Sequence, residues 1–405
     1  MSKIIPFHAV RPTADKVALV TCRTYDDYSS AELASLLDFN PYSFLHVINP
    51  AYANAQKTTL EKRFKAVSNK YTDFKNDTIL HKDVKPAFFL HEIQTKEHTF
   101  MGIVAGVSID DYKNNSIKKH EDTLQYRVEY FKDYLLQTGF NTEPVLITYA
   151  DDFEINNFII IKKNTPPVYN FSTTKKEVHT LWKIDTETEI EFLQKKFESI
   201  NALYIADGHH RSASAELLFD ENQHSNNANL NYFMGFLIAE SQVKIYEFNR
   251  IIRDLNGLSK AQFLDQLADH FIIKIKHQEL WKPQSKFEFG MYLDHDFYAL
   301  FYKQDIKNPG ILANLDAQIL YDKVLQPLLG IADLRNDDRI EYIPGKQSVL
   351  TLKEVIDEGE FEVGFLLYPS DISEIKALAD NNLIMPPKST YIEPKFRSGL
   401  LIYEL

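Results

Sequence analysis

Residues 202–216 constrain the fold of this chain more than any other segment. A short apolar run at residues 203–206 stops at Asp207 and Gly208. Two histidines, an arginine and a series of small helix-forming residues follow directly. This order predicts a buried strand, a tight turn and the start of a helix. The fold must therefore include a strand that leads straight into a helix.

The predicted helix start is suited to binding an anion. The first backbone N–H groups of a helix have no partner within it, and the helix dipole favours negative charge there. N–H groups from Gly208 onward, the imidazoles of His209 and His210 and the guanidinium of Arg211 would hold two phosphates. In a purely structural alternative, Asp207 caps the helix and pairs with Arg211. A third alternative makes both histidines metal ligands, which adjacent positions make awkward.

The length, composition and net charge of the chain limit the kinds of protein and of binding partner to be considered. The 405 residues are many for one hydrophobic core, so two or three domains are expected. The chain is 44% hydrophobic and 25% charged, which is typical of folded rather than disordered proteins. A net charge of −12 without a run of five or six Lys or Arg argues against nucleic acid as a partner.

The remaining bulk features bear on location and assembly. Cys22 is the only cysteine, which excludes an internal disulfide and cysteine-ligated metal sites. The N-terminus has no apolar signal core, and no stretch approaches the ~20 apolar residues of a membrane span. We therefore expect a cytoplasmic protein with no membrane partner. The aromatic content suits a homodimer interface and a large core equally.

Periodicity predicts a mixed α/β fold. We divide the chain into an N-terminal segment (1–105), a central core (106–240) and a C-terminal segment (241–405). The clearest amphipathic helix is expected at 120–138, where Leu124, Val128, Phe131 and Leu135 recur at helical spacing. Other helices are predicted at 30–38, 58–70, 187–200, 260–270, 315–328 and 371–380. Besides 203–206, strands are predicted at 40–48, 87–94, 100–107, 144–149, 232–239, 297–302 and 363–367.

Several blocks resemble one protein family. Residues 207–211 are similar to the Asp-Gly-His-His-Arg signature of a bacterial and archaeal family of unknown function, related to the free-serine kinases of the ParB/sulfiredoxin-like superfamily. Tyr25-Asp26 with residues 40–47, His120-Glu121-Asp122-Thr123 with Arg127, and residues 385–391 resemble further family blocks in the expected order. The resemblance implies a ParB/sulfiredoxin-like nucleotide-binding core elaborated by N- and C-terminal α/β segments.

The resemblance also implies a function. It suggests a phosphotransferase that moves a phosphoryl group from ADP or ATP to a small hydroxylated metabolite, most simply L-serine, with Mg²⁺. Glu121 is then the base that activates the acceptor hydroxyl. Asp207 is the second choice for the base and a possible Mg²⁺ ligand. Thr123 joins residues 208–211 at the phosphates, whereas His120, Lys388, Ser389 and Thr390 bind the acceptor.

The chain departs from the family pattern at two places, of which the second concerns the substrate. The family usually has Pro-Pro-Tyr-Asp where this chain has Arg23-Thr24-Tyr25-Asp26, and His-Arg where this chain has Asn249-Arg250. Two other functions stay open: a non-catalytic nucleotide-binding regulator of the ParB type and a metal-dependent phosphohydrolase. From the residues alone, the prolines at 386 and 387 make 385–391 an ordered loop. Its polar groups suit a surface loop as well as a binding loop.

Overall fold

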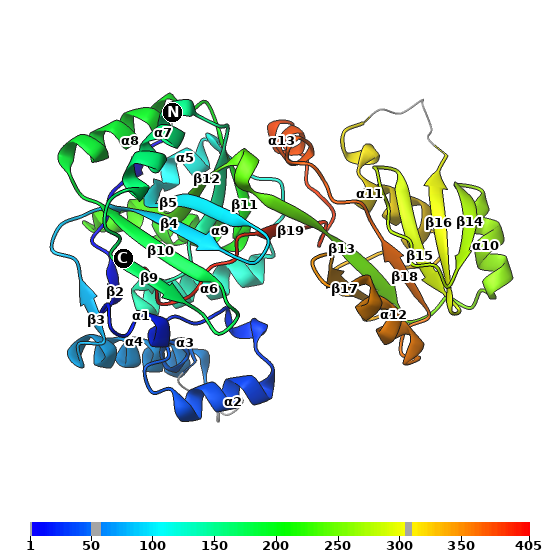
Figure 1. Ribbon diagram of the computed structural model, residues 1–405, viewed down its shortest axis with the longest axis horizontal. Helices are drawn as coiled ribbons and strands as arrows, with labels where there is room; N and C mark the ends of the chain where they lie inside the picture. Colours follow the sequence, from blue (N-terminus) through cyan, green and yellow to red (C-terminus); the bar gives the residue numbers. More distant parts are fainter. Residues whose placement is uncertain (1, 50–57, 304–309) are drawn as a thin grey trace. The chain divides into compact units, whose positions relative to one another are not determined.

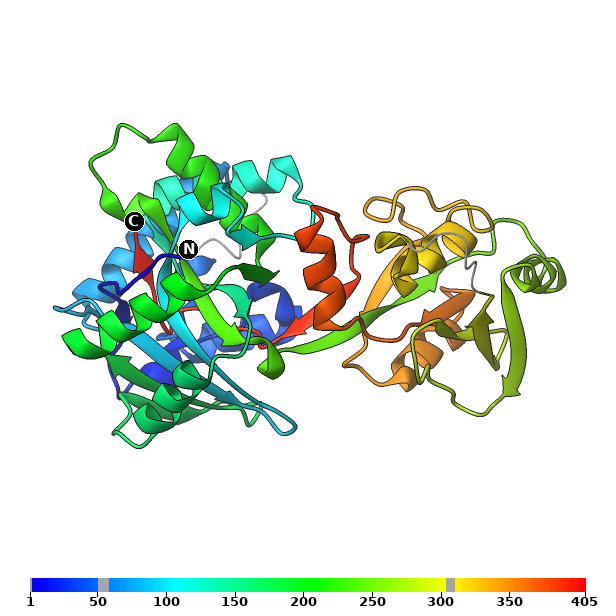
Figure 2. The same cartoon turned by 90° about the horizontal axis from the view of Figure 1, so that it is seen from above.

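The computed structural model of the protein describes residues 2–49, 58–303 and 310–405. Its contacts divide the chain into two compact units. Unit 1 comprises residues 1–119, 123–243 and 394–405, and unit 2 comprises residues 120–122 and 244–393. Both ends of the chain therefore belong to unit 1 (Figure 2). The mixed α/β class is confirmed, whereas the division into three segments at 105 and 240 stays a prediction.

Within the described residues, unit 1 is built on a nine-stranded mixed sheet (Figure 1). The strand order is β6-β11-β8-β12-β5-β4-β10-β9, and β1 pairs with β5. The pairs β6–β11 and β8–β12 are parallel, and the other pairs are antiparallel. The strands are β1 (Ile4–Ile5), β4 (Phe88–Gln94), β5 (Thr99–Ser108), β6 (Ile117–Lys118), β8 (Val145–Tyr149), β9 (Tyr169–Ser172), β10 (Val178–Ile184), β11 (Leu203–Asp207) and β12 (Tyr232–Ala239).

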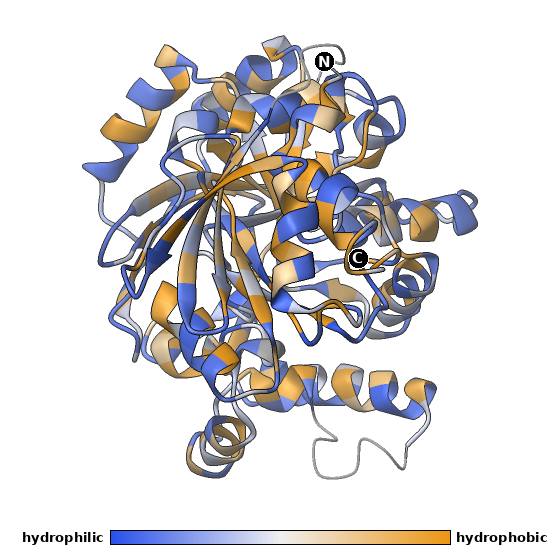
Figure 3. Ribbon diagram, turned by 90° about the vertical axis from the view of Figure 1, so that its right-hand side faces the viewer, coloured by the Kyte–Doolittle hydropathy of each residue, from blue (hydrophilic) through white to orange (hydrophobic). Residues whose placement is uncertain are grey.

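Helices bury their apolar faces against this sheet. Leu193 and Phe197 of α8 and Ile155 and Ile159 of α7 join the same core as strand residues such as Ile147. Burying such side chains stabilises the unit by about 1.5–3 kcal/mol each. The helices are α5 (Ile109–Lys113), α6 (Gln125–Thr138), α7 (Phe153–Lys163), α8 (Glu187–Ser199) and α9 (His209–Glu221). Figure 3 shows hydrophobic and hydrophilic residues alternating around the helices.

The N-terminal part of unit 1 adds a second, smaller core. Phe44, Leu45 and Val47 are buried there with residues of α2 and α4. The prediction of a strand at 40–48 is wrong, because residues 45–48 form the short helix α3 (Leu45–Ile48). A helical turn buries Phe44, Leu45 and Val47 together, whereas an extended strand would point successive side chains to opposite faces. The other elements of this part are α1 (Val17–Val20), η1 (Tyr25–Asp27), α2 (Ser30–Phe39), α4 (Leu60–Asn76), β2 (Val10–Pro12) paired with β3 (Leu80–Lys82), and β7 (Phe140–Asn141) paired with β20 (Tyr403–Glu404).

Unit 2, over its described residues, contains a seven-stranded antiparallel sheet. The strand order is β14-β16-β15-β18-β13-β17, and β19 also pairs with β13. One core contains residues of α10 and α11, and a separate core contains residues of α12. The elements are β13 (Lys244–Ile252), α10 (Lys260–Ala268), β14 (Phe271–His277), β15 (Glu288–Leu293), β16 (Asp296–Tyr302), α11 (Asp316–Leu320), η6 (Tyr321–Leu325), β17 (Ile340–Pro344), α12 (Val349–Asp357), β18 (Val363–Leu366), α13 (Ile372–Asp380) and β19 (Thr390–Glu393).

In the part of the chain that the structure describes, none of the helices combines the length and the apolar character needed to cross a bilayer.

Candidate functional site

The predicted strand–turn–helix junction is confirmed. β11 ends at Asp207, Gly208 is the N-cap residue, and α9 begins at His209. Gly208 has φ +99°, a left-handed backbone conformation that residues other than glycine rarely adopt. A Cβ atom at this position would also lie 3.0 Å from Nε and Nη2 of Arg211. Gly208 thus allows both the sharp turn and the packing of Arg211 over it.

Asp207 is surrounded by positive charge. Its Oδ2 lies 3.2 Å from Nζ of Lys395 and accepts a hydrogen bond of 3.3 Å from Nη2 of Arg211. Burial alone would raise the pKa of Asp207, but the charges of Lys395 and Arg211 outweigh it and hold the pKa below its usual value. The ion pair with Arg211 expected in the structural alternative is present, whereas a cap by the Asp207 side chain is not among the described contacts, since the N-cap is Gly208. Asp207 therefore stays ionised at neutral pH and orients Arg211.

The guanidinium of Arg211 is fixed from three sides. Nη1 donates to the carbonyl oxygen of Pro144 at 2.6 Å and lies 3.7 Å from Oε2 of Glu143, and Nη2 donates to Asp207. The side chain remains 22% exposed, so an anion can still approach it. Such preorganisation lowers the entropy cost of forming each new hydrogen bond to a phosphate.

The two histidines have different surroundings. His209 is buried in the first turn of α9. Nε2 of His210 accepts a 3.1 Å hydrogen bond from the backbone N–H of Leu124, the residue before α6. An Nε2 that accepts this bond is unprotonated, so a neutral His210 carries its proton on Nδ1. His210 therefore ties the start of α9 to the start of α6.

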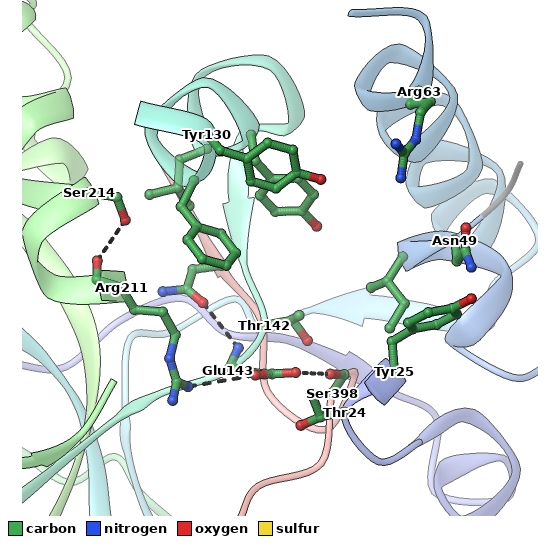
Figure 4. Close-up of a pocket in the computed structure, with 15 residues that line it drawn as sticks. Thr24, Tyr25, Asn49, Arg63, Tyr130, Thr142, Glu143, Arg211, Ser214 and Ser398 are labelled. Carbon is green, nitrogen blue, oxygen red and sulfur yellow. Dashed lines mark hydrogen bonds and ion pairs between the residues drawn. The ribbon is translucent and has the colours of Figure 1, made fainter. Parts of the chain in front are cut away.

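A cavity of about 410 Å³ lies beside this turn, and we call it the α6–α9 pocket (Figure 4). Arg211 and Ser214 of α9 lie on one side of it, Tyr130 and its neighbours on α6 form a wall, and Arg63 of α4 lies across from them. The lining residues are Thr24, Tyr25, Ile48, Asn49, Arg63, Tyr130, Phe131, Tyr134, Leu135, Asn141, Thr142, Glu143, Arg211, Ser214 and Ser398. All of them belong to unit 1.

The floor of the pocket carries an ordered polar network. Glu143 pairs with Arg211 and accepts a hydrogen bond of 2.6 Å from Oγ of Ser398 (Figure 4). Its backbone N–H donates to Oδ1 of Asn141 at 3.0 Å. Burial raises the pKa of the Tyr134 phenol, so this ring stays neutral. No ion pair to Arg63 is found among the described residues, so Arg63 is a second cation available to a ligand.

This combination suits a ligand with a planar ring and an anionic group. Aromatic side chains offer faces for stacking, and arginine binds phosphate or carboxylate with two parallel hydrogen bonds. Sequence reasoning did not find Arg63, Glu143 or Ser398, which come from separate elements and have no motif. Tyr130, Phe131 and Tyr134 carried a weak signal as three aromatic residues within five positions of one helix.

The expected helix at 120–138 begins later than predicted. α6 starts at Gln125, and residues 120–124 form an irregular lead-in, so Glu121 does not lie in a first helical turn. Two contacts fix this lead-in within unit 2: the carbonyl of His120 accepts from the N–H of Met385, and Asp122 pairs with Arg335 at 3.2 Å. These tertiary contacts outweigh the local helix pattern. Thr123 is the first residue of the chain's return to unit 1.

The predicted acceptor loop belongs to unit 2. Lys388 has φ +53°, its carbonyl accepts a hydrogen bond of 3.3 Å from Nη2 of Arg250, and its Nζ lies 5.2 Å from the ring centroid of Phe248. Oγ of Ser389 donates to the carbonyl of Pro386, and Thr390 begins β19. The loop is ordered, as expected. Its role in binding an acceptor stays a prediction, as does the role of His120.

Comparison with known families decides the classification. The family described as "Protein of unknown function (DUF1015)" matches residues 4–318. The chain belongs to this family. The match includes the 207–211 turn and ends before residues 388–390. The placement in the ParB/sulfiredoxin-like superfamily stays a prediction.

Comparisons with individual proteins give weaker likenesses. No curated protein matches the sequence. A free serine kinase in complex with AMP is 14% identical, with 76% of this chain and 94% of that chain covered and a TM-score of 0.38. SbnI with C-terminal truncation from Staphylococcus aureus is 15% identical, with coverage of 73% and 85% and a TM-score of 0.39. A conserved hypothetical protein from Pyrococcus furiosus is 13% identical, with coverage of 74% and 95% and a TM-score of 0.34.

Proposed function

We propose that this protein is a phosphotransferase that moves a phosphoryl group from ADP or ATP to a small hydroxylated metabolite, with L-serine as the first acceptor to test. The α6–α9 pocket carries the proposal, because it places a preorganised arginine at a helix N-terminus beside aromatic side chains. The N-terminus of α9 and Arg211 would hold phosphates. The aromatic wall of α6 would hold the adenine base.

The charges around Asp207 bear on which of the two candidate carboxylates activates the acceptor. Asp207 faces Lys395 and Arg211, which lower its pKa and make it a weak base. Glu121 is the base that the family resemblance implies, and the two cations that hold Asp207 ionised favour Glu121 over Asp207 for this role. We therefore assign Glu121 as the base and Asp207 as the residue that orients Arg211.

We propose that Mg²⁺ binds to this protein together with the nucleotide. Across the described residues, no group of three His, Cys, Asp or Glu side chains is arranged to hold a metal ion, and Asp207 is engaged by two cations. Because two cations already contact its carboxylate, Asp207 is not suited to act as a metal ligand. Mg²⁺ commonly binds through substrate phosphates and water with few protein ligands. No step is assigned to it.

Replacing Glu121 with glutamine tests the activity. Loss of a general base slows transfer by about 10²–10⁴-fold, whereas nucleotide binding should persist. The protein would be incubated with Mg²⁺, L-serine and either ATP or ADP, and O-phosphoserine followed by phosphorus NMR. Glu129→Gln, which removes an exposed carboxylate from α6, is the matched control and should retain the parent rate.

Three outcomes would contradict the proposal. Nucleotide binding without transfer to serine or to any of a panel of small alcohols would favour a regulator. Nucleotide hydrolysis without transfer would favour a phosphohydrolase. Equal transfer by the parent and Glu121→Gln would remove Glu121 from the mechanism.

Arg63→Gln tests the ligand of the α6–α9 pocket. Because Arg63 lines the pocket and no described residue forms an ion pair with it, its loss should weaken ATP binding about tenfold, or about 1.4 kcal/mol. The melting temperature should change little. Lys65→Gln, on the exposed side of the same helix, should bind ATP as the parent does. Calorimetric titration of both variants gives the comparison, and equal affinities would exclude Arg63 from the nucleotide site.

A further inference from the structure

Unit 2 contains a cavity of about 300 Å³ that is separate from the proposed nucleotide site and lined entirely by unit 2 residues. We call it the Glu247 cavity. It lies between β13, the connection from β17 to α12, and the end of β18. Its lining residues are Lys244, Ile245, Tyr246, Glu247, Lys282, Pro283, Gly345, Val349, Leu366, Leu367, Tyr368 and Pro369.

The carboxyl group of Glu247 lies directly against the backbone of Gly345. A Cβ atom built on Gly345 would overlap the carboxyl carbon and oxygens of Glu247, so the glycine leaves room for the carboxyl in this position. Within the described parts of the chain, no ion pair or hydrogen bond links this carboxyl to another side chain. Burial raises the pKa of Glu247, although a hydrogen bond from its own backbone N–H and the charges of Lys282, Arg250 and Lys244 act against the rise. A partly desolvated carboxylate with no side-chain partner is suited to binding a cationic group of a ligand.

Two side chains that line the cavity are positively charged. Lys244 and Lys282 both line it, and no described residue forms an ion pair with either. Val349 is the first residue of α12, a helix of nine residues, so the positive end of a helix dipole lies at the cavity wall. One carboxylate, two ammonium groups and a helix N-terminus around one cavity are the complement of a molecule that carries both charges.

The remaining wall is apolar. Val349, Leu366, Leu367, Pro283 and Pro369 supply aliphatic surface. We propose that the Glu247 cavity binds a small zwitterion with an aliphatic side group, chemically an aliphatic α-amino acid. Its ammonium group contacts Glu247, its carboxylate lies toward Lys244, Lys282 and the start of α12, and its side group packs on the apolar wall. This assignment does not depend on phosphoryl transfer in unit 1.

Calorimetric titration with three matched probes tests the proposal on the full chain without nucleotide. The probes are L-leucine, isopentylamine, which lacks the carboxylate, and 4-methylpentanoate, which lacks the amine. L-leucine should bind at least tenfold more tightly than either. Glu247→Gln should weaken leucine binding by a similar factor, and so should Lys282→Gln, an exposed loop position that leaves the core intact. Glu341→Gln, an exposed carboxylate on β17, is the control and should bind as the parent does.

Three results would overturn the assignment. The first is that none of the three probes binds the parent protein, and the second is that isopentylamine binds as tightly as leucine. The third is that leucine binds to Glu247→Gln and to Lys282→Gln as tightly as to the parent. Because no nucleotide is present, none of these results bears on the proposed phosphotransferase activity.

Discussion

Replacing Gly208 with alanine is expected to damage both stability and nucleotide binding. The left-handed backbone at φ +99° costs a residue with a Cβ atom about 1–2 kcal/mol. The new methyl group would also displace the Arg211 guanidinium, which lies 3.0 Å from the Cβ position. Arg211 would then lose its contacts with Pro144 and Glu143. We expect affinity for ATP to fall by at least about tenfold, measured by calorimetric titration.

Gly139 provides a matched control for this substitution. It also belongs to unit 1, has φ +76°, and has no atom within 4 Å of a built Cβ. Gly139→Ala should therefore show the backbone cost alone, as a loss of about 1–2 kcal/mol in the free energy of unfolding. Nucleotide affinity should be unchanged. If the two variants lose the same stability and bind ATP equally, the contact between Gly208 and Arg211 does not contribute to ATP binding.

Acidification below about pH 6.5 is expected to destabilise unit 1 through a buried histidine pair. His91 on β4 and His179 on β10 are 3% and 1% exposed. Nε2 of His91 and Nδ1 of His179 lie 3.1 Å apart, so one nitrogen must donate and the other accept. Burial lowers the pKa of both residues, and their mutual repulsion lowers that of His91 further. Two protonated rings would place two N–H groups against each other.

The sign of the effect follows from proton uptake. Below the ordinary histidine pKa of about 6.5 the unfolded chain binds protons that the folded pair does not. The stabilisation is therefore full above pH 6.5 and is lost as the pH falls toward the folded pKa values, by up to about 1.4 kcal/mol per pH unit for each histidine. Urea unfolding between pH 7.5 and 5 measures this slope.

Glutamine variants separate the pair from other titrating groups. His91→Gln keeps a neutral hydrogen-bonding side chain and should flatten the dependence of unfolding free energy on pH. His224→Gln removes an exposed histidine and should leave the slope unchanged. Parallel profiles for the parent and His91→Gln would assign the acid sensitivity to other groups.

The sequence predicted the elements whose local signals agree with their packing. Gly208 after an apolar run predicted the strand–turn–helix junction, and Gly139 predicted the end of α6 at Thr138. Prediction failed where tertiary contacts outweighed local preference. Residues 45–48 form a helix because it buries three neighbouring apolar side chains together. Residues 120–124 stay irregular because Met385 and Arg335 hold them.

The same distinction applies to the sites. Residue order and glycine geometry are local, so the sequence is enough to predict that the 207–211 turn is a helix N-terminus with three cationic or hydrogen-bonding side chains. Packing of distant elements brings Lys395 to Asp207, Glu143 to Arg211 and Arg63 to the same pocket. These partners lie between 60 and 190 residues away along the chain, roughly, and their approach depends on packing of the whole unit rather than on local conformational preference.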